Sequence, residues 1–269
     1  MDPGFRQNYR EQRLRSRGLF YLYAMKDNFS KQADVYAKYR PDYPQQLFDF
    51  ILAQVPQKEN GWDCATGNGQ TAKVLANYFA NVYATDISQK QIDKAQPASN
   101  IHYSLQPAEQ TDFADNSFDL VTVSQALHWF NFDPFYKEVK RVARPGSVFA
   151  SWSYSLLYVS PEIDKLIRSF YTDTIGPYWD AERKHVDEEY RTIPFPFTEM
   201  KAPPFTMQYQ WTIEELEGYL NTWSALQKFI AANQYNPVNE LIDQLRPLAG
   251  NEKMTVLFPL HIRIGIIEK

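Results

Sequence analysis

The sequence is poor in cysteine, in long apolar runs and in excess charge. Its single cysteine, Cys64, excludes an internal disulfide and suits a reducing compartment. No apolar run reaches the ~18 residues that a membrane-spanning helix needs, and no secretory signal pattern is present. We therefore expect a cytoplasmic protein without a membrane partner.

The charge balance argues against nucleic acid as a partner. The 269 residues carry 28 basic and 32 acidic side chains, a net charge of −4, so they have no general attraction to a phosphate backbone. With 44% hydrophobic residues the chain can bury a full core. A small molecule fits better as a partner, and we expect no metal site and a monomer or homodimer.

Residues 1–24 differ in character from the remainder. They contain five arginines and few apolar positions, and Met25-Lys26-Asp27 then opens a segment that looks like an ordinary start. We interpret residues 1–24 as a leader or tag outside the fold. A basic arm that contacts RNA is the alternative.

The most informative stretch is 63–71, which reads Asp-Cys-Ala-Thr-Gly-Asn-Gly-Gln-Thr. Two glycines one residue apart, followed by a helical pattern over 70–80, predict a strand, a tight turn and a helix. Glycine lets the backbone bend sharply and approach a ligand closely. The next apolar run ends at Asp86, where an α/β nucleotide site places a carboxylate on a ribose. These features predict a nucleoside cofactor.

The residues around the glycines indicate which nucleoside this is. Gly67-x-Gly69-x-x-Ala72 also matches the dinucleotide pattern, so an NAD-linked oxidoreductase remains an alternative. The Asp63 carboxylate, however, would repel a pyrophosphate and attract an ammonium or sulfonium group. S-adenosylmethionine carries both cations and is therefore favoured.

The remaining pattern predicts an α/β fold. Apolar strand patterns at 101–105, 118–123 and 148–153 alternate with helical segments, which gives five β-α units. The aromatic stretch 154–204 then has the length of an inserted lid. Further elements are expected as a strand at 205–211, helices at 213–232 and 238–245, and an extended run at 254–267.

Taken together, these motifs resemble a class I S-adenosylmethionine-dependent methyltransferase of the small-molecule, methyltransferase type 11 group, which includes ubiquinone-type and trans-aconitate-type enzymes. The resemblance is strong over 28–153 and looser beyond. It implies a Rossmann-like seven-stranded sheet with an antiparallel last strand, helices on both faces and a helical lid insertion. The expected divisions are a cofactor-binding core with an N-terminal lid helix over 25–153, a substrate lid over 154–204, and a completion of the sheet over 205–269.

The resemblance also implies a cofactor site. In it, Asp63, Gly67 and Gly69 line the methionine part, Asp86 takes the ribose hydroxyls and Ile87 packs on the adenine. Ala65 stands at the first glycine of the family's acidic-x-Gly-x-Gly-x-Gly motif. The other positions that match the family are Tyr36 and Arg40 for the methionine carboxylate, Ala108 and Glu109 near the base, and Gln125 beside the methyl group.

The acceptor side is predicted from single residues. His128 follows the fourth strand and suits proton removal from a hydroxyl or amine. A carboxylate acceptor would need only a cationic clamp, for which Arg183 and Arg191 are possible sources. The side chains expected to bind the acceptor are Trp129, Tyr178, Trp179, Arg191 and Trp223.

Two further alternatives remain at this point. A nucleic-acid amino-methyltransferase would carry Asn/Asp-Pro-Pro-Tyr/Phe after the fourth strand, where this chain has Ser124-Gln125-Ala126-Leu127, so we discount it. A regulatory protein that binds the cofactor without turnover is the other alternative.

Overall fold

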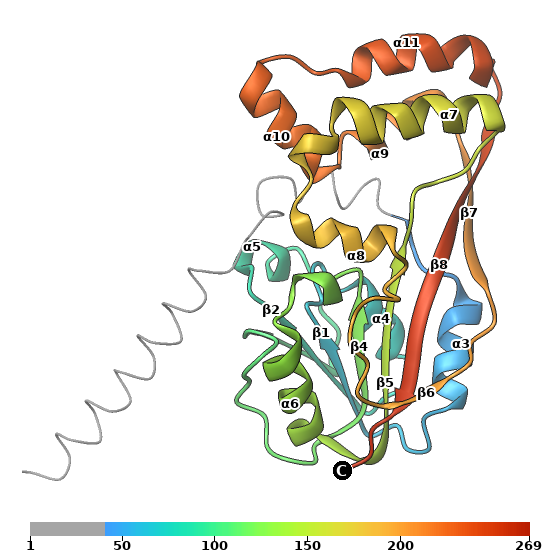
Figure 1. The fold of residues 1–269 in the computed structure, drawn as a ribbon. Helices are drawn as coiled ribbons and strands as arrows, with labels where there is room; N and C mark the ends of the chain where they lie inside the picture. The colour runs from blue at the N-terminus through green and yellow to red at the C-terminus, as the bar shows by residue number, and fades with distance from the viewer. Residues whose placement is uncertain (1–40) are drawn as a thin grey trace, which may run out of the picture.

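Residues 41–269, which the computed structural model describes, are arranged around one mixed sheet (Figure 1). Its strands are β1 (Asn60–Cys64), β2 (Asn81–Asp86), β3 (Ile101–Leu105), β4 (Phe118–Ser124), β5 (Ala143–Tyr154), β6 (Thr198–Met200), β7 (Phe205–Trp211) and β8 (Met254–Ile266). The helices are α3 (Gln45–Ala53), α4 (Gln70–Leu75), α5 (Gln89–Ile92), α6 (Phe132–Val142), α7 (Pro161–Ser169), α8 (Lys184–Asp187), α9 (Ile213–Leu220), α10 (Ser224–Asn233) and α11 (Val238–Ala249).

The strand order confirms the predicted sheet. Strands β3, β2, β1, β4 and β5 are parallel neighbours, and β8 runs antiparallel beside β5. Both β6 and β7 pair with the outer edge of β8, so the sixth strand position is filled by two segments. Between them lie Pro203 and Pro204, which have no backbone N–H to give to a strand ladder.

Helices cover both faces of the sheet, as predicted. On one face, Leu47 of α3 and Leu75 of α4 are buried in a cluster with Trp152 of β5. On the other face, Phe135 of α6 packs with Phe149 of β5. Because alternate side chains of a strand point to opposite faces, β5 contributes to both cores.

The first strand forms although its sequence is not a typical apolar run. Trp62 is fully buried and its indole N–H donates to Thr85 Oγ1 at 2.9 Å. Asp119 Oδ2 accepts from the backbone N–H groups of Glu59 and Asn60 at 2.9 and 3.0 Å. The strand is therefore held by side-chain hydrogen bonds that its own pattern does not reveal.

Two predicted helices differ in the structure. Helix α4 ends at Leu75 rather than Ala80, where the Asn100 amide donates to the carbonyls of Ala76 and Phe79. The expected helix over 213–232 is divided into α9 and α10. The chain becomes extended at Trp223, whose indole is buried against Phe170 and Tyr219.

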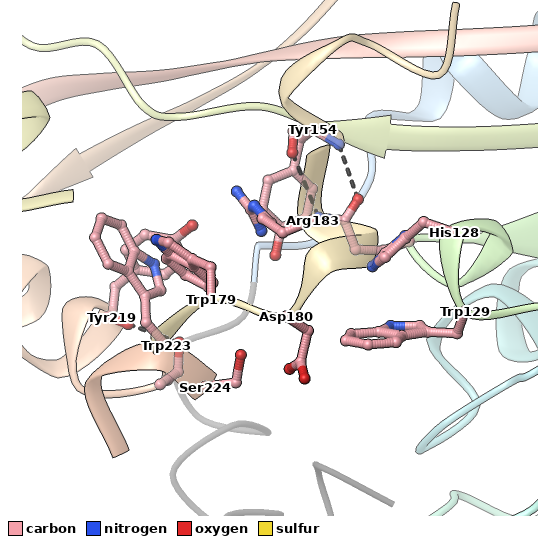
Figure 2. Close-up of a pocket in the computed structure, with 11 residues that line it drawn as sticks. His128, Trp129, Tyr154, Trp179, Asp180, Arg183, Tyr219, Trp223 and Ser224 are labelled. Atoms are coloured by element: carbon pink, nitrogen blue, oxygen red, sulfur yellow. Dashed lines mark hydrogen bonds between the residues drawn. The ribbon is translucent and has the colours of Figure 1, made fainter. Parts of the chain in front are cut away.

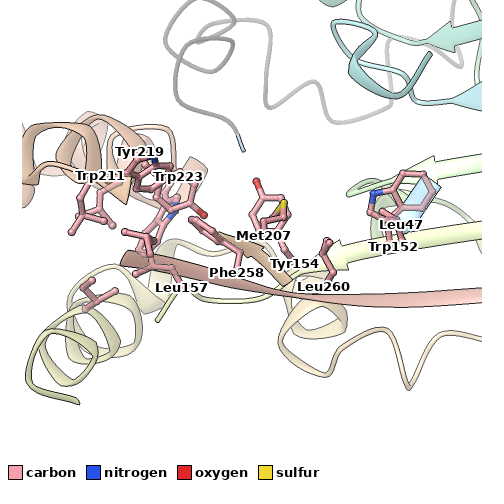
Figure 3. Packing of buried hydrophobic residues seen from close by; sticks show 14 of the residues in the cluster. Leu47, Trp152, Tyr154, Leu157, Met207, Trp211, Tyr219, Trp223, Phe258 and Leu260 are labelled. Atoms are coloured by element: carbon pink, nitrogen blue, oxygen red, sulfur yellow. The ribbon is translucent and has the colours of Figure 1, made fainter. Parts of the chain in front are cut away.

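A helical cap lies beyond the carboxyl ends of the parallel strands (Figure 1). We use the term cap for α7 together with α9, α10 and α11; α7 and α9 both pack on α11. Tyr154, Met207 and Phe258 continue the core of the sheet into this region (Figure 3). The cap therefore combines helices from the predicted lid and from the C-terminal stretch. None of the helices between residues 41 and 269 is long and apolar enough to cross a bilayer.

Candidate functional site

The loop between β1 and α4 is organised by a buried carboxylate. Asp63 is fully buried, and it accepts hydrogen bonds from Thr66 Oγ1 at 2.5 Å, Thr122 Oγ1 at 2.9 Å and the Ala72 N–H at 3.1 Å. Burial raises the pKa of Asp63 to about 6, and the charge of Asp86 adds to this rise. In this structure Asp63 therefore binds the loop and the start of α4, and its contact with a cofactor stays a prediction.

Three residues of this loop have left-handed backbone conformations. The φ angles are +54° at Ala65, +57° at Gly67 and +83° at Gly69. A side chain at Gly69 would collide with the Tyr103 hydroxyl, whereas a Cβ at Gly67 would meet only Gln91 Oε1, at 4.0 Å, within residues 41–269. The loop therefore leaves open space next to the Gly67 backbone. Ala65 takes a conformation that favours glycine, which the family motif has at this position.

Asp86 lies at the end of β2 and contacts the glycine loop directly. Its Oδ2 accepts from the Gly67 N–H and its Oδ1 from the Ser88 N–H, both at 2.8 Å. A carboxylate offers about four lone-pair sites, a capacity compatible with the ribose contact predicted for Asp86. Ile87, the next residue, is partly exposed and can pack against a base.

The turn after β3 supplies an unsatisfied acceptor. Glu109 Oε1 accepts from the Asn131 N–H at 3.0 Å, while Oε2 is buried and has no hydrogen-bond partner among residues 41–269. Such an atom suits an amino group like that of adenine. The neighbouring Ala108 is buried.

Three carboxylates lie close enough to Cys64 to act on its thiol. Burial raises the pKa of its thiol well above the usual value, and the carboxylates of Glu109, Asp63 and Asp86 raise it further. The thiol therefore stays protonated, and the three carboxylates form an acidic surrounding. Together with the open space at Gly67 and the unsatisfied Glu109 oxygen, this surrounding fits a cationic adenosine derivative.

A pocket opens between the carboxyl end of β4 and the cap (Figure 2). Six residues named from the sequence line it: Gln125, His128, Trp129, Trp179, Arg183 and Trp223. The other lining residues are Tyr154, Asp180, Tyr219, Thr222 and Ser224.

Two of the residues predicted for the acceptor lie outside this lining. The Tyr178 hydroxyl accepts from the Asn233 amide at 2.8 Å, and its ring packs on Phe229 at 5.2 Å. The Arg191 side chain is 73% exposed. The predicted residues Tyr36 and Arg40 lie outside the part of the chain that the structure describes.

Gln125 connects the ends of β4 and β5 on one side of the pocket. Its Oε1 accepts from the Tyr154 N–H at 2.9 Å and its Nε2 donates to the Tyr154 carbonyl at 3.4 Å. Its φ of +53° is a left-handed conformation that costs a non-glycine residue energy. Strain of this kind is typical of ligand sites.

Arg183 places a guanidinium at the pocket wall. Its Nε donates to the Tyr171 hydroxyl at 2.8 Å and lies 3.4 Å from Asp187 Oδ1, and its plane packs 4.7 Å from the Trp179 ring centroid. Burial alone would lower the pKa of Arg183, but Tyr171 and Asp187 outweigh it, so the net shift is upward. Its two terminal nitrogens have no hydrogen-bond partner among the described residues.

His128 is buried at the base of the pocket. Its Nδ1 lies 2.8 Å from the hydroxyl of Tyr190, and its ring packs on Trp129 with centroids 4.8 Å apart. Sequence reasoning missed Tyr190, as it missed Tyr154, Asp180 and Tyr219. No local pattern marks these residues, because only the packing of the cap brings them to the end of β4.

Comparisons with known proteins bear on both the loop and the pocket. The methyltransferase type 11 model, described as a methyltransferase domain, matches residues 62–151. A Dictyostelium discoideum protein named as a methyltransferase is 33% identical over 245 residues, which cover 88% of this chain and 93% of that protein.

Two further similarities are informative. A solved structure described as a type II methyltransferase from Anaeromyxobacter dehalogenans is 38% identical, covers 85% of this chain and 98% of its own, and has a TM-score of 0.79. A Saccharomyces cerevisiae relative, named as an S-adenosylmethionine-dependent methyltransferase, is 26% identical over 136 residues, 47% of this chain and 45% of that protein.

Similarity over this length includes the cap as well as the glycine loop, which a shared nucleotide motif alone would not produce. This similarity identifies S-adenosylmethionine, and not a dinucleotide, as the cofactor of the family. The chain belongs to the type 11 family of S-adenosylmethionine-dependent methyltransferases.

Proposed function

We propose that the protein transfers the methyl group to an oxygen atom of a small, partly apolar molecule, a carboxylate in preference to a hydroxyl. The observation that carries this proposal is Arg183, which lines the pocket and whose hydrogen bond within residues 41–269 is made by Nε, to Tyr171, so its terminal nitrogens are left for a ligand. A guanidinium binds a carboxylate through two parallel hydrogen bonds.

The walls of the pocket support an apolar body for this acceptor. Trp129, Trp179 and Trp223 line it from three different parts of the chain. Flat aromatic side chains bind planar or hydrocarbon groups through burial and ring contacts. Asp180 also lines the pocket, and it is paired with Lys228 at 2.5 Å, so its charge is compensated.

Methyl transfer requires mainly that the protein position the methyl donor and the acceptor relative to each other. Bound S-adenosylmethionine supplies an electrophilic methyl group on a sulfonium, and the acceptor oxygen must approach in line with the carbon–sulfur bond. Holding two reactants in such a geometry contributes on the order of 7–11 kcal/mol. A carboxylate is anionic at neutral pH and needs no protein base.

The roles of individual residues follow the geometry of the two regions. Asp86 would hold the ribose, Glu109 Oε2 the adenine amino group, and the Gly67 backbone would face the methionine part. Gln125, bonded to Tyr154, would border the methyl group. The cap would act as the lid over the acceptor.

The test is transfer of a labelled methyl group to a panel of aromatic and aliphatic carboxylic acids and the matching alcohols. We expect acids to be methylated and Arg183→Gln to lower kcat/KM for them by about 10- to 100-fold, the range for lost hydrogen bonds to a charged group. Affinity for S-adenosylhomocysteine, measured by calorimetry, should stay unchanged.

Arg246→Gln is the matched control, because this arginine is half-exposed and pairs with Glu214 on the outside of the cap. Equal losses in both variants, or a preference for alcohols, would contradict the carboxylate assignment. Tight cofactor binding without transfer to any acceptor would favour the regulatory alternative.

A further inference from the structure

The contact between His128 and Tyr190 is the most enclosed polar contact at the pocket. Tyr190 is fully buried and His128 is 5% exposed, with His128 Nδ1 and the Tyr190 hydroxyl 2.8 Å apart. Their ring centroids lie 5.9 Å apart at an interplanar angle of 45°. The direction of this hydrogen bond decides what the imidazole can do.

The surroundings of Tyr190 determine where its hydrogen goes. Burial raises the pKa of this hydroxyl strongly, so it remains protonated. Among residues 41–269, Nδ1 of His128 is the hydrogen-bond partner of this hydroxyl. Because a buried donor without a partner is costly, the hydroxyl hydrogen goes to Nδ1 of His128.

The nearby ionisable groups do not change this assignment. Arg183 and Tyr136 are the others that act on Tyr190, and a guanidinium cannot accept a hydrogen bond. The Tyr136 hydroxyl has no hydrogen-bond partner among residues 41–269, so it does not receive the Tyr190 hydrogen. Nδ1 of His128 is therefore the acceptor that receives the Tyr190 hydrogen.

The backbone at Tyr190 is strained in a way that preserves the contact. Glu189 and Tyr190 have successive φ angles of +59° and +60°, although neither is glycine. The Tyr190 carbonyl accepts from Arg263 Nη1 at 3.2 Å, and Arg263 is itself fixed by Glu199 through two bonds of 2.8 Å. Strain of this kind persists only where the surrounding structure holds it, and it clusters at functional sites.

We propose that Tyr190 is a positioning residue that fixes His128 in the tautomer with hydrogen on Nε2, so that His128 offers the methyl acceptor a hydrogen bond and does not remove its proton. A neutral imidazole that accepts at Nδ1 must carry its hydrogen on Nε2. The inference rests on the proposed function and narrows it, because transfer then proceeds without a protein base.

The reaction balances without a proton. A lone pair of the carboxylate oxygen forms the bond to the methyl carbon, and the electrons of the carbon–sulfur bond remain on sulfur. The acceptor becomes a neutral methyl ester and the sulfonium becomes a neutral thioether. A hydroxyl acceptor would have to lose a proton, and His128 in this tautomer cannot take it.

The first test needs no acceptor. In protein labelled with 15N-histidine and bound to S-adenosylhomocysteine, long-range 1H–15N spectra report which ring nitrogen carries hydrogen in each of the four histidines. The His128 signal is the one that disappears in His128→Asn, and exposed His102 serves as the reference for exchange between tautomers.

We expect His128 in a single tautomer with hydrogen on Nε2, and a mixture of tautomers in Tyr190→Phe. Hydrogen on Nδ1 in the wild-type protein would overturn the inference. This result does not depend on turnover, so a failure of the proposed function remains distinguishable from a failure of this assignment.

The second test is a double-mutant cycle with the acid that the methylation panel identifies. Tyr190→Phe should lower kcat about tenfold, the effect of one lost hydrogen bond, at unchanged S-adenosylhomocysteine affinity. In a His128→Ala background the same change should cost less than about twofold, because Tyr190 acts through His128.

His128→Gln separates a donor from a base, since its amide keeps an N–H but cannot take up a proton at neutral pH. It should retain clearly more activity than His128→Ala. An equal cost of Tyr190→Phe in both backgrounds, or equal inactivity of the Gln and Ala variants, would overturn the positioning role.

Discussion

The glycine loop and the pocket beneath the cap, which we propose binds the acceptor, are built in different ways. The loop takes its residues from one short stretch, 63–72, plus Asp86, and its hydrogen bonds go largely to backbone N–H groups. The pocket takes its residues from the end of β4, the end of β5, the segment before α8 and the junction of α9 and α10. Its walls are mostly aromatic side chains.

This difference separates two kinds of constraint. The loop needs particular φ angles and acceptors at particular backbone atoms, so few residue types serve at each position. The pocket needs a shape, one charge and apolar surface, which many residue combinations can supply. Changes in the loop should therefore affect stability and cofactor binding, whereas changes in the pocket should affect the acceptor alone.

The largest effect is expected at Asp63. Its folded-state pKa of about 6 lies above the ordinary 3.8, so its contribution to stability is present below pH ~4 and is lost as pH rises through about 6. Two pKa units correspond to about 3 kcal/mol. Asn does not titrate, so the Asp63→Asn variant lacks this pH dependence. The difference in unfolding free energy between wild type and this variant should therefore fall by about this amount between pH 4 and 8.

Urea unfolding at several pH values measures this difference, and Asp243→Asn, on an exposed part of α11, is the control. A difference that does not change with pH would show that Asp63 is not held in a raised-pKa environment.

The next effect concerns the cofactor. Asp86→Ala removes the acceptor for the Gly67 and Ser88 N–H groups and the proposed ribose partner. We expect S-adenosylhomocysteine to bind ~1.5–3 kcal/mol more weakly by calorimetry, with KM for the acceptor little changed. Asp93→Ala, an exposed carboxylate after α5, is the control. Unchanged affinity would mean that Asp86 supports the loop only.

The third prediction concerns the pocket, where acceptor binding should change and cofactor binding should not. Tyr171→Phe removes the hydroxyl that accepts from Arg183 and donates to Asp187 at 2.6 Å. With Arg183 less fixed, KM for the acid should rise about fivefold, equivalent to ~1 kcal/mol. Cofactor affinity should stay the same; if it falls together with the acceptor affinity, the two regions are coupled.

The smallest effect is expected at Ala65. A φ of +54° costs an L-residue roughly 1–2 kcal/mol, and glycine would remove this strain. Glycine also makes the unfolded chain more flexible, which offsets ~0.4–1 kcal/mol of that gain. Ala65→Gly should therefore stabilise the protein by about 0.5–1 kcal/mol in thermal or urea unfolding. Ala76→Gly, at a right-handed position, should destabilise it instead. Destabilisation by both changes would contradict the strain at Ala65.

Much of the fold was predictable because its signals are local. The alternation of apolar strands and helices, the glycines at 67 and 69 and the terminal Asp86 require only neighbouring residues to be understood. The errors arose where a distant side chain intervened. Asn100 ends α4 early, and the burial of Trp223 divides the helix expected over 213–232.

The candidate site shows the same limit. His128 and Gln125 could be placed at the end of the fourth strand from the sequence, but their partners could not. Tyr190 lies 62 positions from His128, and Tyr154 lies 29 positions from Gln125. Neither pairing has a sequence pattern, because each depends on which faces of the sheet and cap meet.

The amino-acid sequence by itself determined the α/β order, the position of the glycine loop and the carboxylate at the end of the second strand, because backbone conformation and short-range periodicity dictate them. The tertiary structure alone decided that Arg183 lines one pocket together with three tryptophans and that Tyr190 contacts His128. Those contacts join segments far apart in the chain, and only the packing of a complete core specifies them.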